Sequence, residues 1–402
     1  MPQYRHLGAI PPKRHTANRR DGGHKGEGIY YEEVVTTAGF GRAYSIVYHL
    51  RPPTRVLKVE PAGDMALEFV RQAALRHHHL KSGALPKAGD PIHGRVPLLA
   101  NDDVILSRCR PEKPQEELFR NASADEVIFV HHGKGTLHTM FGPLPFREYD
   151  YVVIPRTTTY RIIFEGDADL LIVESTGALT LPSHYLNPDG QLRLGAPYSE
   201  RDLHGPTQIA FIDKEEPTTV VVKDFSPLPS AGEGPGVRGA RLTRYTLAQH
   251  PFDVVGWDGM VYPFTFNADD FEPITGRIHQ PPPVHQTFDA PGFVLCTFAP
   301  RMLDTDPDAI KVPYAHSNVQ ADEVLYYVRG RFGSRRGVEE ASFTLHPHGI
   351  PHGPHPGTIV ASKDVKFTDE LAVMLDTFRP LLLTKQALAL DDAGYPFSWA
   401  DG

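Results

Sequence analysis

Short apolar runs broken by turn residues recur along most of this chain and predict many β-strands. Residues 44–50 and 292–298 show the pattern well, since each combines β-branched and aromatic residues and is flanked by Gly or Pro. Residues 64–76 differ, because their Ala, Leu, Gln and Arg content and their apolar spacing predict an amphipathic helix. The triplet His77 to His79 would end that helix, where a histidine is favourable against the helix dipole.

The abundance of turn-forming residues agrees with a strand-rich chain. Its 402 residues include 38 Pro and 35 Gly, which favour short strands with frequent turns over long helices. We therefore expect an all-β dominated fold with a few short helices.

Two stretches of the chain repeat one pattern of residues. Residues 121–133 and 318–330 share Asn, Ala, Asp, Glu, Val and Gly in register and without a gap. Each stretch is followed by a further strand-rich run and a proline turn, at Pro155 and at Pro347. A repeat of this kind indicates an internal duplication, so we expect two similar units in one chain.

The duplication predicts a division of the chain into four segments. Residues 1–30 are expected to form a flexible N-terminal arm, and residues 31–225 the first domain. Residues 226–241 are a low-complexity Gly/Pro stretch with little to bury, which predicts a loop between the halves. Residues 242–402 would form the second, catalytic domain.

The second copy of the repeat carries a His-Glu-His pattern. His316 and Glu323 occur in the spacing His-x-Asn-x4-Glu-x6-Gly, and His352 follows a Pro-x-Gly turn about thirty residues on. This pattern is typical of a cupin, a jelly-roll β-barrel with a metal in its mouth. Two imidazoles and one carboxylate leave coordination positions open and suit non-haem Fe(II) and O2 chemistry. One such histidine would ordinarily be a hydrogen-bonded loop residue, but the three together predict the metal ligands.

Asp322 competes with Glu323 for the carboxylate position. Side chains alternate along a strand, so only one of the two can point inward. The register of the repeat and the six-residue gap to Gly330 favour Glu323. Asn318 stands where many cupins carry a further histidine, and an amide is a poor ligand, so three ligands are expected.

The first copy of the repeat lacks this ligand set. Phe119 takes the place of His316, and Tyr160 takes the place of His352, which leaves Glu126 alone. One carboxylate does not hold iron. We therefore predict a first barrel that is structural and free of metal.

Further histidines surround the predicted ligands. His346 ends the strand before the proline turn and is placed to face a substrate, whereas His348 and His355 are expected at the rim or behind the ligands. His279 and His285 flank a polyproline run, which is extended and stiff. Such a segment is a good mount for an acid–base residue, although a surface loop with incidental histidines fits it nearly as well.

Charge, apolar runs and cysteines limit the location and the partners. The net charge is −8 and no basic helix is evident, which argues against nucleic acid as a partner. No signal peptide and no run of roughly 18 apolar residues is present, so we expect no membrane association. The two cysteines, Cys109 and Cys296, lie far apart and fit a reducing cytoplasm.

These motifs together resemble the homogentisate 1,2-dioxygenase family in its bacterial, two-cupin form. The resemblance is strong over about residues 255–360 and weaker through the N-terminal half. The matching motifs are Val261-Tyr-Pro263-Phe-x-Phe-Asn267, Phe298-Ala-Pro300-Arg301, Val312-Pro-Tyr314-Ala-His316-x-Asn318, Glu323-x6-Gly330 and Leu345-His346-x4-Pro351-His352-Gly353-Pro354.

The resemblance implies an Fe(II) enzyme that cleaves the ring of homogentisate with O2. The product would be maleylacetoacetate, a step of tyrosine and phenylalanine breakdown, and the family implies a homo-oligomer. The implied iron ligands are His316, Glu323 and His352. The implied base is His279, with His285 as the fallback because the loop length differs. The residues implied on the substrate side are Tyr314, His346, His352 and Phe332.

Departures from the family pattern leave the substrate open. Phe332 stands where a substrate-contacting Tyr is expected, and the loop between His279 and Arg301 is reshaped and shorter. The gap from His316 to Glu323 is also one residue longer than in the animal enzymes. Gentisate or another hydroquinone acid is therefore an alternative substrate. A metal-binding bicupin without oxygenase activity is the alternative from another class.

Overall fold

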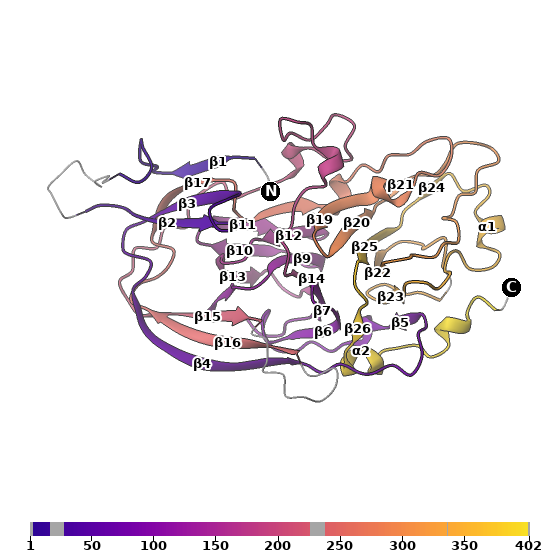
Figure 1. Ribbon diagram of the computed structural model, residues 1–402, viewed down its shortest axis with the longest axis horizontal. Coiled ribbons are helices and arrows are strands. Elements are labelled where there is room, and N and C mark those ends of the chain that lie inside the picture. The colour runs from indigo at the N-terminus through magenta and orange to yellow at the C-terminus, as the bar shows by residue number, and fades with distance from the viewer. Residues whose placement is uncertain (1–2, 17–27, 226–237, 336, 401–402) are drawn as a thin grey trace.

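The computed structural model describes residues 3–16, 28–225, 238–335 and 337–400. Strands dominate it and gather into two β-rich units joined side by side, one around β9 to β16 and one around β19 to β25 (Figure 1). The predicted fold class, an all-β chain of two cupin barrels with a few short helices, is confirmed.

Two seven-stranded sheets build the first unit, and they are antiparallel except that β8 and β15 run parallel. The first sheet has the order β11 (Gly142–Phe146), β10 (Gly135–Thr139), β13 (Thr159–Phe164), β8 (Leu118–Asn121), β15 (Thr218–Asp224), β16 (Arg238–Leu247) and β4 (Val56–Leu67). The second has the order β18 (Phe264–Asn267), β12 (Asp150–Ile154), β9 (Asp125–His132), β14 (Asp169–Ser175), β7 (Val104–Cys109), β6 (Arg95–Ala100) and β26 (Leu382–Leu383).

Three smaller sheets complete the part of the chain that the structure describes. The six-stranded sheet of the second unit has the order β19 (Gln286–Ala290), β20 (Phe293–Phe298), β25 (Leu371–Thr377), β22 (Asp322–Arg329), β23 (Phe343–His346) and β5 (His78–Leu80). Beside it β21 (Arg301–Met302) pairs with β24 (Phe367–Thr368). The four-stranded sheet has the order β1 (Arg5–Gly8), β17 (Val254–Gly259), β3 (Tyr44–His49) and β2 (Tyr31–Thr36).

Helices are few and short. The α-helices are α1 (Thr358–Ala361) and α2 (Lys385–Ala389). The 3-10 turns are η1 (Ser82–Ala84), η2 (Ser183–Tyr185), η3 (Glu200–Asp202), η4 (Ala268–Asp270), η5 (Pro282–His285) and η6 (Tyr395–Phe397). The structure has no helix, within the ranges it describes, that is long and apolar enough to cross a membrane.

The helix predicted for residues 64–76 is wrong. Residues 64–67 end the long strand β4, which pairs with β16 along its length, and the rest of the segment is not helical. The ladder with β16 supplies hydrogen-bond partners that outweigh a weak local helix propensity. His78 and His79 accordingly lie in β5 and not at a helix end.

The duplication extends to matching hydrogen bonds. β9 and β22 occupy equivalent places in the two units, and each is followed by a glycine with positive φ, Gly133 and Gly330. Asp125 at the start of β9 accepts backbone N–H bonds from Arg156 and Leu179. Asp322 at the start of β22 accepts the corresponding bonds from the backbones of His348 and Leu381. This aspartate therefore fixes the barrel wall in both copies.

Several segments do not follow the predicted division of the chain. β5 comes from the first half but pairs with β23, whereas β26 comes from the C-terminal region but pairs with β6. β1 lies in the expected arm and pairs with β17, because its backbone groups complete that sheet. Residues 17–27 and 226–237 lie outside the described residues, and 238–241 belong to β16. The four-segment division remains a proposal.

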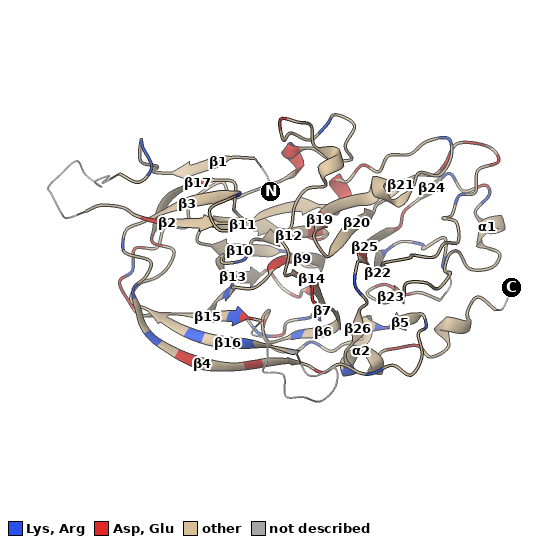
Figure 2. Cartoon of the chain, viewed as in Figure 1, with Lys and Arg blue, Asp and Glu red and all other residues tan. Residues whose placement is uncertain are grey.

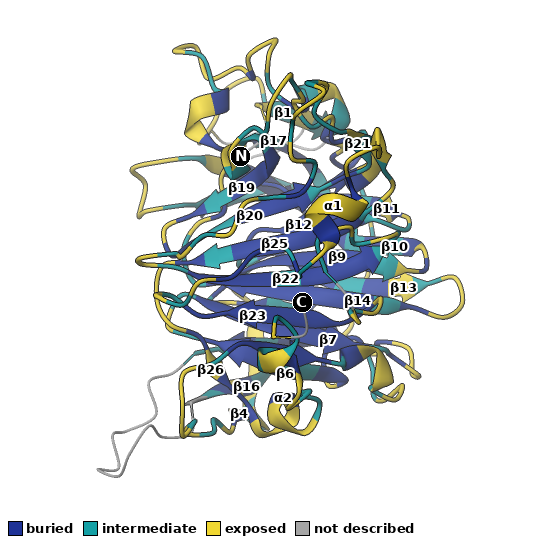
Figure 3. Cartoon of the chain, turned by 90° about the vertical axis from the view of Figure 1, so that its right-hand side faces the viewer, coloured by how far each residue is buried: buried dark blue, intermediate teal, exposed yellow. Residues whose placement is uncertain are grey.

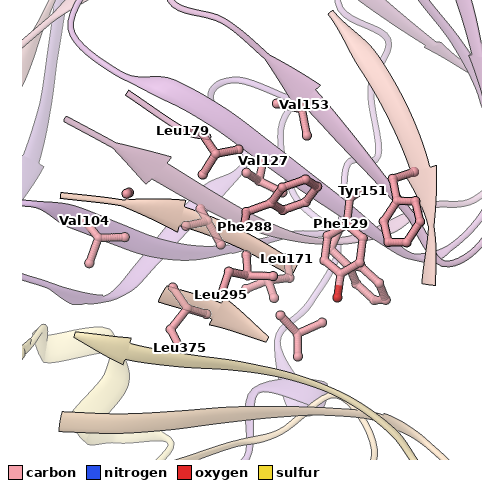
Figure 4. Packing of buried hydrophobic residues seen from close by; sticks show 14 of the residues in the cluster. Val104, Val127, Phe129, Tyr151, Val153, Leu171, Leu179, Phe288, Leu295 and Leu375 are labelled. Atoms are coloured by element: carbon pink, nitrogen blue, oxygen red, sulfur yellow. The ribbon is translucent and has the colours of Figure 1, made fainter. Parts of the chain in front are cut away.

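A continuous apolar core joins the two units. Most strands are buried along most of their length, whereas β4 and the connecting loops are largely exposed (Figure 3). Figure 4 shows part of this core, and the first unit contributes Val127, Phe129 and Leu171, while the second contributes Phe288, Leu295 and Leu375. Each fully buried side chain of this kind stabilises the fold by about 1.5–3 kcal/mol. Charged residues lie along the outer strands β4, β15 and β16, with basic residues alone on β16 (Figure 2).

Candidate metal centre

The structure brings His316, Glu323 and His352 together in the second unit. One ligand atom of each lies within 4.8 Å of the others. Nε2 of His316 is 3.4 Å from Oε2 of Glu323, and Nε2 of His352 is 3.4 Å from Oε1. The two imidazole ring centres are 4.3 Å apart. The three predicted ligands, which are far apart in the sequence, thus converge on one point.

Backbone pairing fixes the two histidines beside each other. The N–H of His316 donates to the carbonyl of His352 at 2.8 Å, and the N–H of His352 donates back at 2.9 Å. A Cβ atom on Gly353 would lie 2.6 Å from Cα of Ala315, so glycine is needed for the two segments to approach. Glu323 faces them because Asp322 points to the opposite face of β22 and caps backbone N–H groups.

The residues present fit a divalent metal ion. Nδ1 of His316 lies 3.3 Å from the carbonyl of Tyr314, and Nδ1 of His352 lies 3.1 Å from that of Ile350. A carbonyl only accepts, so Nδ1 carries the proton in each ring and the Nε2 lone pair faces Glu323. Nε2 of His352 is also buried without a hydrogen-bond partner. Two lone pairs and a carboxylate aimed at one point form a donor set that suits a divalent metal ion.

Carboxyl groups in the centre have strongly shifted pKa values. Burial alone would raise the pKa of Glu323, but the neighbouring imidazole side chains of His316, His346 and His352 hold it well below its usual range. Asp376 lies directly opposite Glu323 on β25. Burial and the charge of Glu323 raise the pKa of Asp376 to about 7. In the chain without metal, one carboxylate is thus ionised and its neighbour resists ionisation.

His346 lies behind the carboxylate. It is fully buried, with Nδ1 2.9 Å from Oε1 of Glu323 and Nε2 3.1 Å from the hydroxyl of Tyr395. Burial lowers the pKa of His346 to about 3, so its ring is neutral and donates one proton, which fits Glu323 as the acceptor. His346 and His352 are absent from the cavity lining, so this placement differs from the predicted contact of His346 with substrate.

A cavity of about 300 Å³ opens beside His316 and Glu323. It takes in the predicted residues His279, His285, Tyr314 and Phe332. Aromatic and cationic side chains complete much of the wall, namely Phe298, Tyr327, Arg301 and Arg335. A cavity of this size and composition suits one small aromatic ring with an acidic group.

Two candidate bases line this cavity in different ways. His279 is partly exposed, with its ring centre 5.2 Å from that of Tyr314. His285 is buried, packs 4.4 Å from the ring of Phe298, and has no hydrogen-bond partner for Nδ1. Burial lowers the pKa of both, that of His285 well below its usual value. Both rings are therefore neutral near pH 7 and able to accept a proton.

Several residues around the centre had no local sequence signal. His77 packs edge-on against His346 and His352, with ring centres 5.4 and 6.1 Å away. Trp399 donates from Nε1 to the carbonyl of Gly353 at 3.1 Å. These residues arrive from the first half and from the C-terminal segment. Asp376 is likewise brought to the centre by strand pairing, because β25 places it opposite Glu323.

Comparisons with known proteins found similarity to dioxygenases. The profile of the family described as "Homogentisate 1,2-dioxygenase N-terminal" matches residues 108–268. A protein named "Putative dioxygenase" of Saccharolobus solfataricus is 38% identical over 399 residues, which covers 98% of each chain. The homogentisate 1,2-dioxygenase of Rhodopseudomonas palustris is 26% identical over 293 residues, covering 69% of this chain and 60% of that protein.

Among solved structures, a cupin 2 conserved barrel domain protein from Leptotrichia buccalis aligns with a TM-score of 0.36 and 8% identity, covering 79% of this chain and 100% of that one. The two-barrel fold and the full-length match define the class of the protein, an oxygenase built on cupin barrels. The chain belongs to the homogentisate 1,2-dioxygenase family.

Proposed function

We propose that this protein is an Fe(II)-dependent dioxygenase that opens the ring of homogentisate with O2 to give maleylacetoacetate. The observation that carries the proposal is the convergence of His316, Glu323 and His352 beside a cavity for one aromatic ring. These three residues would hold the iron. When bound, Fe(II) supplies open coordination positions for O2 and the ring hydroxyl and a route for electrons between them.

The cavity wall would orient the substrate. Tyr327, Phe298 and Phe332 offer apolar faces to the ring. Arg335 donates to the carbonyls of Gly353 and Ser334, and no described carboxylate lies within ion-pair distance of it. Its guanidinium is therefore available to an anionic arm of the substrate. Holding the substrate in a fixed orientation makes its reaction with O2 effectively unimolecular and so lowers the entropic part of the barrier.

A neutral histidine would take the proton of the ring hydroxyl. His279 and His285 both line the cavity and both have lowered pKa values. Removal of that proton makes the ring electron-rich and ready for oxidation. His346 would hold Glu323 in place during turnover, because it donates to the carboxylate from the side away from the cavity.

The assignment of the ligands is tested by His352→Ala. The wild-type protein, reconstituted with Fe(II) under argon, is expected to bind one iron and to consume O2 with homogentisate. His352→Ala is expected to lose iron and activity together, since two ligands remain. Stoichiometric iron with full turnover in this variant would overturn the assignment.

Gentisate or another hydroquinone acid is a second candidate substrate. Phe332, which lines the cavity, replaces a hydroxyl-bearing residue of the family pattern and makes the wall more apolar. A panel of aromatic acids, followed by ultraviolet absorbance of the ring-opened product, separates the two candidates. A higher kcat/KM for gentisate than for homogentisate would favour the second.

A further inference from the structure

Each barrel places two carboxyl groups opposite one another on neighbouring strands. Glu126 of β9 pairs with Glu174 of β14 in the first unit, and Glu323 of β22 pairs with Asp376 of β25 in the second. Directly opposed residues project to the same face of a sheet, with Cβ atoms about 4.5–5.5 Å apart. The spatial orders β12-β9-β14-β7-β6 and β23-β22-β25-β20-β19 make the two pairs equivalent. Two adjacent buried carboxylates repel and require a counter-charge.

The first barrel supplies that counter-charge with two side chains. The guanidinium of Arg95 contacts Glu126 closely and lies 3.6 Å from Glu174. Nζ of Lys223 lies 2.5 Å from Oε1 of Glu174. The four side chains are at most 3% exposed, so the cluster is a closed set of two negative and two positive charges. Tyr160, in the place of His352, donates to Glu126 at 2.6 Å and completes the set.

Among the described residues of the second barrel, no Lys or Arg forms an ion pair with either carboxyl group of the equivalent pair. Glu323 has only histidines within ion-pair distance among the described residues, and Oδ1 of Asp376 is buried without a hydrogen-bond partner. Arg335 contributes a positive charge near Glu323, but its Nη1 donates to the carbonyls of Gly353 and Ser334 and not to a carboxylate. β19, the counterpart of the strand that carries Arg95, contains no Lys or Arg. The equivalent carboxyl pair therefore lacks the two positive charges of the first barrel.

We propose that Asp376 is a charge-balancing residue of the metal centre, which together with Glu323 neutralises one divalent cation. Arg95 and Lys223 would do the same for the carboxylates of the first barrel, which predicts a single ion per chain. Asp376 lies outside the group of three ligand atoms, so it acts on the ion from beyond the ligands and is a positioning residue. This inference rests on the metal centre of the proposed function.

The test is the Fe(II) affinity of Asp376→Asn, measured under argon by competition with a ferrous chelator. The variant keeps the shape of the side chain and removes its charge. Loss of such a partner of a metal site typically weakens binding about 10–100-fold, and we expect that range. Asp376→Glu restores the charge and is expected to restore affinity to within a few fold. Asp376→Ser provides a second uncharged variant if the first does not fold.

Two controls separate the possible failures. Asp150→Asn removes a buried carboxylate of the first unit, bonded to Asn267 and the backbone of Arg147, and is expected to leave Fe(II) affinity unchanged. Equal Fe(II) affinity of wild type and of a folded Asp376→Asn or Asp376→Ser would refute the role of Asp376 and leave the proposed function intact. A wild-type protein that binds no Fe(II) would overturn the proposed function itself. Two tightly bound ions per chain would contradict the internal neutrality of the first barrel.

Discussion

Histidines of this protein differ in charge because their ring nitrogens face different partners. His346 is neutral, since burial outweighs its single bond to Glu323. His49 has Asp253 and Glu33 on its two nitrogens, and these bonds overcome burial and raise its pKa to about 9. The residue type therefore does not determine the role, and the hydrogen-bond partner of each nitrogen does.

The choice of base is a prediction at the residue scale. His279→Phe removes the proton acceptor from the cavity wall without touching a ligand, so iron should stay bound. Ring opening should slow by about 10²–10⁴-fold, the usual scale for loss of a general base. Rapid-mixing kinetics with homogentisate, together with iron analysis, measures both. His285→Phe is the matched variant, and a larger loss there with little effect at His279 would transfer the role to His285.

The strand elements carry the duplication more faithfully than the individual side chains do. β9 and β22 share their position, their aspartate cap and the glycine with positive φ that follows. The side chains in the interior have diverged, so that one barrel holds charged pairs and the other a candidate metal centre. The strands that form the barrel wall can therefore be retained while the side chains inside the barrel change their chemistry.

Gly330 offers a prediction at the scale of the element. Its φ is +88°, and a Cβ atom would lie 2.5 Å from the carbonyl oxygen of Asp369. Gly330→Ala should therefore destabilise the fold by more than the roughly 1–2 kcal/mol of left-handed strain alone. Gly166→Ala is the control, because its φ is +100° with no atom within 4 Å of the added Cβ. Denaturant unfolding compares the two, and equal losses would contradict the steric argument.

The sequence allowed the equivalence of the strands to be predicted, because strand alternation and turn residues are local. The sequence matches Phe119 to His316 and Tyr160 to His352. The structure agrees, because Phe119 lies beside Tyr160 in the first unit, as His316 lies beside His352 in the second. The helix predicted over residues 64–76 failed because pairing with β16 is not a local property. The same limit hid Asp376, whose partner is set by the sheet.

At the scale of the molecule, long-range pairings interlock the two units. β5 and β26 each cross from one half to the sheet of the other, and the core is continuous between them. Unfolding of one unit therefore exposes apolar surface of the other. We expect the whole molecule to unfold in a single cooperative transition. A buried charge in any sheet then affects the global free energy of unfolding.

The buried His49 predicts a pH dependence of global stability. Its pKa of about 9 in the folded chain exceeds the unfolded value near 6.5, so the folded state holds the extra proton between these values. Its contribution, roughly 3 kcal/mol at most, is fully present below pH 6.5 and is lost as the pH rises through 9. His49→Gln should be less stable than wild type at pH 6 and lose less stability between pH 6.5 and 9. Denaturant unfolding at each pH measures the free energy of unfolding of both proteins. The same dependence on pH in wild type and His49→Gln would contradict this prediction.

The sequence by itself determined the strand-rich fold, the duplication and the trio His316, Glu323 and His352. These features depend on the alternation of apolar and polar residues, on turn residues and on short spacings, all of which are local properties of the sequence. Only the tertiary structure decided that His346 lies behind Glu323, that His77 packs on the ligand histidines, and that Asp376 faces the centre. Each of these depends on which strands become neighbours, and that choice is made by burial of apolar surface over the whole molecule.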